Sequence, residues 1–364
     1  MKALVYGGPG SRRWTAVADP ELVDQEDVLV RVDAVTLCGT DLHILRGDVP
    51  SVSPGRVLGH EAVGTVLAAG MSVRTVAVGD RVLVSCISPC GVCCYCRAQR
   101  YGLCIGGGGW VLGHRIDGVQ AERVRVPFAD RSVHRLPEGV SDESALMLAD
   151  IMPTAYEVGA LNGQIRPGAT VVVVGAGPIG LAAIVSCSLF SPLRTIVVDP
   201  AEQRRDAALG SGADEALADA AEAERRVAEL TDGRGADVVL EAVGVPEAFD
   251  LCTRLVAPGG HLANIGVHGS AVPLHLETLW DRDVTITTGL VDTSSTPTLL
   301  SMLASGRLRL PRLVTHRFGL DEIQDAYDVF SRPAETGAIK VVMFGQAARD
   351  DTSTAFQSAE RAAI

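Results

Sequence analysis

The sequence feature that most constrains the fold is a glycine motif that directly follows an apolar strand. Residues 170–174 read ThrValValValVal, and a helical pattern follows the motif. The motif residues are Gly175, Gly177, Pro178, Ile179 and Gly180. In such a G-x-G-x-x-G turn the first glycine permits the tight bend, the second lets the backbone approach a pyrophosphate, and the third lets helix pack on strand. The motif therefore predicts a dinucleotide site in an α/β domain.

Apolar strands alternate with Ala-rich helical stretches after Pro153. This alternation predicts a doubly wound parallel sheet with helices on both faces, that is, a Rossmann domain. The uncharged run 171–190 has the length of a membrane span, but three glycines and a proline lie in its middle. We interpret it as a buried strand, a turn and a buried helix.

Asp199 ends the next apolar strand, nineteen residues after Gly180. An acidic residue at this place accepts hydrogen bonds from the adenosine ribose and repels a 2′-phosphate, which favours NAD over NADP. Arg204 and Arg205 follow closely, and an arginine turned toward the ribose would weaken that preference. We expect both arginines to be exposed helix charges.

The chain of 364 residues exceeds the usual size of one domain. Between Leu29 and Val126 short apolar runs are broken by glycine and turn residues, which predicts a mostly β domain. We expect this domain to comprise residues 1–153 and 296–346, with the Rossmann domain, residues 154–295, inserted. Residues 347–364 have no clear period and are expected to form a flexible tail.

The net charge of −12 disfavours nucleic acid and anionic membranes as partners, because both need clustered Lys and Arg. The apolar run after Lys2 is too short for a signal peptide. We therefore expect a cytoplasmic protein.

Four of the nine cysteines have the spacing of a metal site. They follow the pattern C-x2-C-x2-C-x7-C and are Cys90, Cys93, Cys96 and Cys104. Four thiolates enclose a tetrahedral Zn²⁺ without an open position, so the predicted role is structural. Cys94 falls outside the regular spacing. The alternative is a loop of free thiols, which a reducing compartment would also permit.

A second group of residues carries a family resemblance. Cys38-Gly-Thr40-Asp-Leu-His43, Gly59-His60-Glu61, GlyAspArgVal at 79–82 and Asp150 before Pro153-Thr154 resemble the zinc-containing medium-chain alcohol dehydrogenases. The resemblance extends from Met1 to about Gly345, and the aspartate at 150 is similar to the bacterial secondary-alcohol branch. It implies that the mostly β domain is GroES-like and catalytic.

The resemblance also assigns roles to individual residues. Cys38, His60 and Asp150 match the ligands of a catalytic zinc, and Glu61 is an alternate ligand. Three protein ligands leave a fourth position for water or substrate. The matching positions of the proton relay and the cofactor contacts are Thr40, His43, Thr154 and His268.

The predicted function is reversible oxidation of a small primary or secondary alcohol, with hydride transfer to NAD and two zinc ions per subunit. Polyol, threonine or formaldehyde dehydrogenation share the same zinc and cofactor logic and stay open as alternatives. A non-catalytic NAD-binding protein is the alternative from another class. The family resemblance implies a homodimer or homotetramer. The shape of the substrate pocket depends on the loops at 42–50, 110–117 and 293–297. Trp110 and His114 could line this pocket, but a structural role in their glycine-rich loop is the favoured interpretation.

Overall fold

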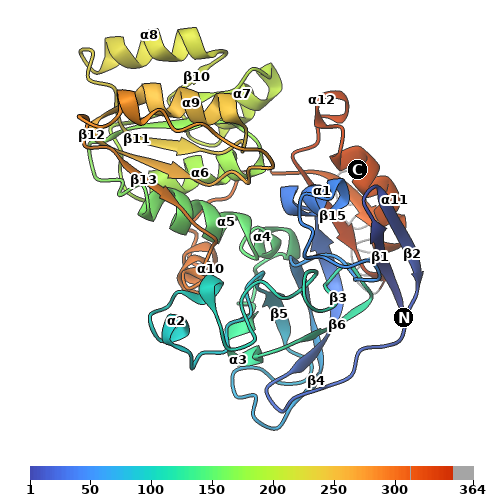
Figure 1. The fold of residues 1–364 in the computed structure, drawn as a ribbon. Helices are drawn as coiled ribbons and strands as arrows, with labels where there is room; N and C mark the ends of the chain where they lie inside the picture. The colour runs from blue at the N-terminus through green and yellow to red at the C-terminus, as the bar shows by residue number, and fades with distance from the viewer. Residues whose placement is uncertain (312, 347–364) are drawn as a thin grey trace, which may run out of the picture. The chain divides into compact units, whose positions relative to one another are not determined.

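The computed structural model describes residues 1–311 and 313–346, so the tail expected at 347–364 lies outside the described residues. The chain forms two compact units (Figure 1). Among the described residues, unit 1 consists of Met1–Asp150, Thr296–Ser305 and 314–346, and unit 2 consists of Ile151–Ser295 and 306–313. Among the described residues no helix is long and apolar enough to cross a membrane.

Unit 1 is built on a mixed sheet with the strand order β14-β15-β3-β4-β5-β7, and β6 pairs with β3. Strands β1 and β2 form a separate hairpin. The strands are β1 (Lys2–Gly8), β2 (Ser11–Ala16), β3 (Val28–Thr36), β4 (Ala62–Ala69), β5 (Arg81–Val84), β6 (Arg123–Val126), β7 (Val133–Arg135), β14 (Val314–Gly319) and β15 (Lys340–Phe344). Strand β15 pairs antiparallel with β3, so the end of the described chain completes the sheet begun near its start.

Unit 1 also contains several short helices. They are α1 (Gly39–Arg46), α2 (Cys94–Arg97), η1 (Tyr101–Leu103), α3 (Ala129–Ser132), α4 (Asp142–Leu146), α10 (Thr296–Ala304), η4 (Leu320–Glu322), α11 (Ile323–Phe330) and α12 (Pro333–Thr336). In α11 the residues Ile323, Ala326, Tyr327 and Phe330 recur at helical spacing and are buried, which attaches the helix to the core of the unit.

Unit 2 is a six-stranded parallel sheet with the order β10-β9-β8-β11-β12-β13. The strands are β8 (Thr170–Val174), β9 (Arg194–Val198), β10 (Glu215–Leu217), β11 (Ala236–Glu241), β12 (Val256–Asn264) and β13 (Thr285–Thr288). Every residue of β8 is buried, as expected for a central parallel strand covered on both faces. The order reverses beside β8, which makes the carboxyl end of this strand the topological switch point where such sheets bind ligands.

Helices lie on both faces of the sheet of unit 2 (Figure 1). They are α5 (Ile151–Thr154), the π-helix η2 (Ala155–Leu161), α6 (Pro178–Ser188), α7 (Glu202–Gly210), α8 (Ala220–Leu230), α9 (Pro246–Leu255) and the short η3 (Leu276–Thr278). The predicted fold class, a doubly wound Rossmann sheet plus a mostly β domain, is confirmed.

Candidate metal centres and nucleotide site

One edge of the sheet of unit 1 collects four metal-binding side chains. Strands β3 and β4 are antiparallel neighbours, so the residues after the end of β3 and before the start of β4 lie at the same edge. Cys38 follows β3, and His60 and Glu61 precede β4. Together with Asp150, each offers one ligand atom, and these atoms all lie within 4.8 Å of one another. The fold thus brings together residues 112 positions apart in sequence.

The distances between these ligand atoms fit a tetrahedral zinc ion. Cys38 Sγ lies 3.2 Å from His60 Nε2, and His60 Nε2 lies 3.4 Å from Asp150 Oδ2. Ligands at the usual zinc distances of about 2.0–2.3 Å are separated by about 3.3–3.8 Å along a tetrahedral edge. One thiol, one imidazole and one carboxylate are ordinary zinc ligands, so these residues fit the metal that the resemblance implies.

The ionisable groups of this cluster perturb one another strongly. Burial raises the pKa of the Cys38 thiol, although the nearby His60 opposes the rise. Burial opposes a charge on His60, yet Cys38 and Asp150 together raise its pKa well above the ordinary value. A cation that replaces the protons on such groups removes this conflict, because metal binding and ligand deprotonation are coupled.

Glu61 forms an ion pair with Lys340, a residue that the sequence analysis did not place at this site. Lys340 Nζ donates to both carboxylate oxygens of Glu61, at 2.8 and 3.1 Å, and to the carbonyl oxygen of Leu37 at 2.8 Å. The two side chains are 0% and 1% exposed. Burial alone would lower the pKa of Lys340, but the Glu61 carboxylate raises it.

The relay candidates lie on α1, directly after Cys38. Asp41 Oδ2 accepts from the Cys38 N–H at 3.0 Å and closes the first turn of the helix. Thr40 is half-buried in this turn. His43 Nδ1 lies 2.8 Å from Asp48 Oδ2, a partner that the sequence did not predict.

The four spaced cysteines form a second cluster in unit 1. One sulfur atom from each lies within 4.8 Å of the others, and Cys90 Sγ is 3.9 Å from Cys96 Sγ. That distance is close to the edge of about 3.8 Å expected for four sulfurs at 2.3 Å from zinc. Backbone N–H groups of Cys96 and Ile105 lower the pKa of the Cys93 thiol to about 6. Cys94 is exposed and lies outside this cluster.

The glycine run after Cys104 lets this loop close. A Cβ on Gly106 would lie 2.4 Å from Cys90 Sγ, and one on Gly108 would lie 2.1 Å from the Ser88 carbonyl oxygen. These glycines are evident in the sequence, but the steric reason for them appears only in the folded loop.

The glycine motif forms the turn between β8 and α6 in unit 2. Gly175 has φ +98°, and a Cβ on Gly180 would lie 1.9 Å from the Gly175 carbonyl oxygen. Gly177 caps α6 and has open space where a Cβ would stand. Pro178 and Ile179 begin α6, and a helix N-terminus that follows such a glycine turn is the usual kind of phosphate site.

Asp199 braces this turn. Its Oδ2 accepts from the Ala176 N–H at 2.8 Å and its Oδ1 from the Ala201 N–H at 2.9 Å. The expectation that Arg204 and Arg205 are exposed helix charges is wrong, because both are half-buried beside Asp199. Arg204 lies 3.8 Å from the carboxylate, and Arg205 donates to the carbonyl oxygens of Asp199 and Pro200.

The other two cofactor candidates also lie in unit 2. Thr154 ends α5 and is half-buried. His268 follows β12, and its Nε2 lies 2.8 Å from Asn264 Oδ1 and 3.4 Å from Glu241 Oε2.

The sequence matches two families of known domains. Residues 24–138 match the alcohol dehydrogenase GroES-like domain, and residues 178–305 match the zinc-binding dehydrogenase domain. An alcohol dehydrogenase of Cupriavidus necator is 36% identical over 368 residues, which cover 94% of this chain and 98% of the relative. An L-threonine 3-dehydrogenase of Pyrococcus horikoshii is 31% identical, over 93% of this chain and 97% of the relative.

The chain belongs to the zinc-containing medium-chain alcohol dehydrogenases. The predicted family is thereby confirmed.

Solved structures of other dehydrogenases resemble this one. The apo form of zinc-dependent alcohol dehydrogenase 2 from Streptococcus pneumonia has a TM-score of 0.91 and 43% identity, covering 95% of this chain and 99% of that one. A zinc-binding dehydrogenase of Sinorhizobium meliloti, bound to NADP, has a TM-score of 0.83 and 30% identity, covering 94% and 98%. An Escherichia coli protein complexed with NADH has a TM-score of 0.85 and 27% identity, covering 94% and 99%.

An aromatic pair borders the first cluster of this dehydrogenase. The ring of Trp110 stands edge-on to His60, with centroids 6.1 Å apart, and stacks on His114 at 4.3 Å. His114 Nε2 lies 2.8 Å from Ser51 Oγ, which fixes the stacked ring. The stacked pair therefore places the Trp110 ring against His60, a metal-ligand candidate.

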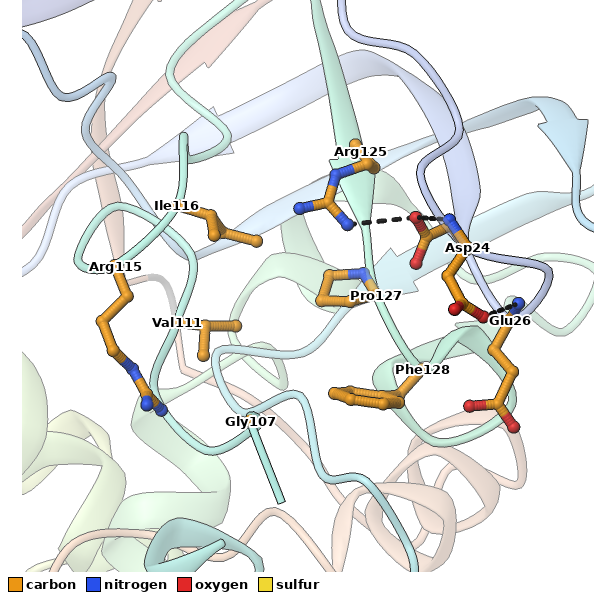
Figure 2. Close-up of a pocket in the computed structure, with 10 residues that line it drawn as sticks. Asp24, Glu26, Gly107, Val111, Arg115, Ile116, Arg125, Pro127 and Phe128 are labelled. Carbon is orange, nitrogen blue, oxygen red and sulfur yellow. Dashed lines mark hydrogen bonds and ion pairs between the residues drawn. The ribbon is translucent and has the colours of Figure 1, made fainter. Parts of the chain in front are cut away.

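A cavity of about 250 Å³ in unit 1 is separate from this cluster (Figure 2). Val111, Ile116, Pro127 and Phe128 give it an apolar lining, and Arg125 reaches across to Asp27 at 3.0 Å. None of the candidate metal ligands lines the cavity.

Lys340 is a residue of this candidate site that sequence reasoning missed. The available signal was a lysine at the start of LysValValMetPhe, an otherwise apolar strand. Lysine is almost never fully buried unless it is paired, so such a lysine implies a buried acid partner.

The four-cysteine cluster generates a prediction about metal content. We expect Cys96→Ser to lower the zinc content by about one ion per subunit, because three thiolates hold a structural zinc poorly. The matched variant Cys94→Ser alters an exposed cysteine in the same loop and should keep the wild-type content. Metal analysis of the purified variants checks this, and equal zinc loss in both variants would contradict the assigned ligand set.

Proposed function

We propose that this protein is a zinc-dependent alcohol dehydrogenase that oxidises a small primary or secondary alcohol by hydride transfer to NAD. The observation that carries the proposal is the convergence of Cys38, His60 and Asp150 in one buried cluster. Three ligands of these types leave one position for the substrate, as a catalytic zinc requires. When bound there, Zn²⁺ acts as a Lewis acid that lowers the pKa of a coordinated hydroxyl by several units.

Asp150 rather than Glu61 is the proposed third ligand. Both oxygens of Glu61 accept from Lys340, whereas Asp150 directs Oδ2 to within 3.4 Å of His60 Nε2. A metal ion on Glu61 would lie beside the buried Lys340 ammonium, and the repulsion between the two positive charges disfavours Glu61 as the third ligand. Lys340 therefore supports Asp150 over Glu61 as the proposed third ligand.

Thr40 and His43 are the proposed path for the proton that the alcohol releases. The Thr40 hydroxyl both accepts and donates, so it can pass a proton toward the cofactor ribose. Asp48 stabilises the proton on Nδ1 of His43, which leaves Nε2 as an acceptor. His43 would then deliver the proton to solvent.

The aromatic pair of Trp110 and His114 supports a small, largely apolar alcohol. A stacked pair of this kind beside the metal limits the substituents that a substrate carries. A threonine substrate needs a partner for its charged amino and carboxyl groups. An L-threonine 3-dehydrogenase is among the relatives. Threonine, polyols and formaldehyde are therefore the alternative substrates that an activity panel must include.

The function is tested by metal content and NAD reduction in wild type and Asp150→Ala. With ethanol, 2-propanol, 2-butanol, L-threonine, a polyol and formaldehyde as the panel, we expect the wild type to reduce NAD with at least one alcohol. Asp150→Ala should lose about one zinc per subunit and fall at least about 100-fold in kcat/KM, because a catalytic ligand is removed. Full zinc content and full activity in Asp150→Ala would indicate that Glu61, rather than Asp150, is the third zinc ligand. A zinc-loaded wild type that is inactive on the whole panel would support a non-catalytic protein.

The proposed preference for NAD rests on the charge of Asp199. Each carboxylate oxygen has two acceptor sites, so it can bond a backbone N–H and a ribose hydroxyl together. We expect Asp199→Ser to raise the ratio of kcat/KM for NADP over NAD by about 10- to 100-fold, because repulsion of the 2′-phosphate is removed. Asp206→Asn serves as the control, because it also removes one negative charge, that of an aspartate on α7. An unchanged ratio in Asp199→Ser would contradict the assigned role.

The proposed assembly is a homodimer or homotetramer in the cytoplasm. Strand β13 lies at the edge of its sheet, and an edge with unpaired backbone groups can pair with a second copy. Trp280 and Leu276, which precede this strand, are 78% and 60% exposed. Light scattering should give a multiple of the 38.1 kDa chain mass, and a monomer at micromolar concentration would refute the assembly.

A further inference from the structure

Glu157 is a buried acid that the proposed chemistry does not use. It lies on the π-helix η2 and is 9% exposed. Its Oε2 accepts from the backbone N–H groups of Asp292 and Thr293, at 2.8 and 2.9 Å. Its Oε1 accepts from the N–H and the hydroxyl of Ser295, at 2.8 and 2.6 Å. A single carboxylate thus satisfies most of the donors of the segment 292–295.

The segment 292–295 depends on this carboxylate for its conformation. Thr293 has φ +60° and is buried, although a β-branched residue is unfavourable in the left-handed region. Such a conformation persists only where the surroundings over-determine it. Two successive N–H groups directed at one buried carboxylate supply that constraint. Without Glu157, the buried N–H of Thr293 and several part-buried donors of the loop would have no acceptor, which is costly.

The helix that carries Glu157 is itself seated on the sheet of unit 2. A Cβ on Gly159 would lie 2.8 Å from Ile265 Cδ1 and 3.7 Å from Leu240 Cδ1. Leu240 belongs to β11 and Ile265 follows β12, so η2 packs on this part of the sheet. Glu157 therefore attaches the loop to a fixed part of the unit. π-Helical segments are rare and are frequently found at functional sites.

The contacts of Glu157 lie close to two points where the chain passes from one unit to the other. The chain passes between the two units four times, first from Asp150 to Ile151 and next from Ser295 to Thr296. Glu157 lies six residues after Ile151, and its contacts end at Ser295, the last residue before the second passage. The first passage carries Asp150, a proposed metal ligand, and Thr154, a proposed cofactor contact. One carboxylate thus joins the first two covalent connections of the nucleotide unit.

We propose that Glu157 is a positioning residue for hydride transfer, a clamp that holds the segment 292–295 and the helix following Thr154 as one body. The proposal rests on the proposed dehydrogenase function. The clamp fixes the two connections by which the cofactor-carrying unit continues into the metal-carrying unit. Its loss should disturb the geometry of transfer while leaving the glycine motif and Asp199 able to bind the nucleotide. The clamp thus affects the rate of transfer rather than cofactor affinity.

The test compares Glu157→Gln with wild type in three measurements on the full, zinc-loaded protein. Glutamine keeps one acceptor oxygen but presents an NH₂ group to donors that need an acceptor. We expect backbone exchange at 292, 293 and 295 to become at least about tenfold faster. Single-turnover hydride transfer should slow by at least about tenfold, because small misplacements of reacting groups cost large factors in rate. The Kd for NADH should stay within about threefold.

A matched control separates positioning from general stability. Asp237 is another carboxylate of unit 2 that accepts from a backbone N–H, that of Thr170 at 2.8 Å. Asp237→Asn should lower the unfolding temperature without slowing hydride transfer. If Glu157→Gln does not fold, Ser295→Ala removes only the hydroxyl contact and should show the same changes at smaller size.

Distinct results would overturn the proposal. Unchanged exchange at 292–295 in Glu157→Gln would refute the clamp itself. Faster exchange with an unchanged rate of hydride transfer, or equal slowing in Asp237→Asn, would leave Glu157 a purely structural role. A wild type that oxidises no alcohol would overturn the proposed function and with it the role in hydride transfer, and the exchange data would still report separately on the clamp.

Discussion

The buried ion pair between Lys340 and Glu61 is the interaction on which the proposed metal centre depends. Strand β15 brings Lys340 beside β3, to the edge where β3 ends and β4 begins. There Lys340 Nζ contacts the Glu61 carboxylate and the Leu37 carbonyl oxygen. Removing one partner of such a pair costs about 3–5 kcal/mol, because the other charge stays buried. The pair therefore holds Glu61 in place and leaves Cys38, His60 and Asp150 as the proposed ligands.

The two units contribute different parts of the proposed chemistry. Unit 1 contains both clusters of metal-binding side chains, and unit 2 contains the glycine motif at the switch point of its parallel sheet. Each site is built by local rules: antiparallel neighbours bring Cys38 to His60, and a strand–turn–helix unit presents backbone N–H groups toward a phosphate. The proposed clamp at Glu157 adds a constraint on the chain segments that connect these parts.

Much of this architecture is predictable from sequence because the relevant signals are local. The glycine motif and the cysteine spacing are contained in six and fifteen residues, and each dictates its own turn or loop. The family resemblance extended the prediction to residues that are far apart in sequence, such as Cys38 and Asp150. The fold class and the family predicted in this way are confirmed, whereas the individual ligand and cofactor roles stay predictions.

The residues that sequence reasoning missed act through distant partners. Lys340 is 279 positions from Glu61, and Glu157 is 138 positions from Ser295, so no local pattern marks either pair. In the sequence, Glu157 is an ordinary acidic residue in a helical stretch. Its burial could not be predicted, because it depends on the way η2 packs on β11 and β12. His43 has a nearer partner in Asp48, yet the contact depends on how the chain turns at Gly47, where the backbone is left-handed.

The most direct test of the account is a stepwise removal of metal, with zinc per subunit and the rate of NADH formation from an active alcohol measured on the same samples. The account predicts two zinc ions per subunit at full activity. Activity should fall in proportion to the loss of one ion and return when Zn²⁺ is restored. Full activity after that ion is lost, or a protein that is fully loaded but never forms NADH, would contradict it.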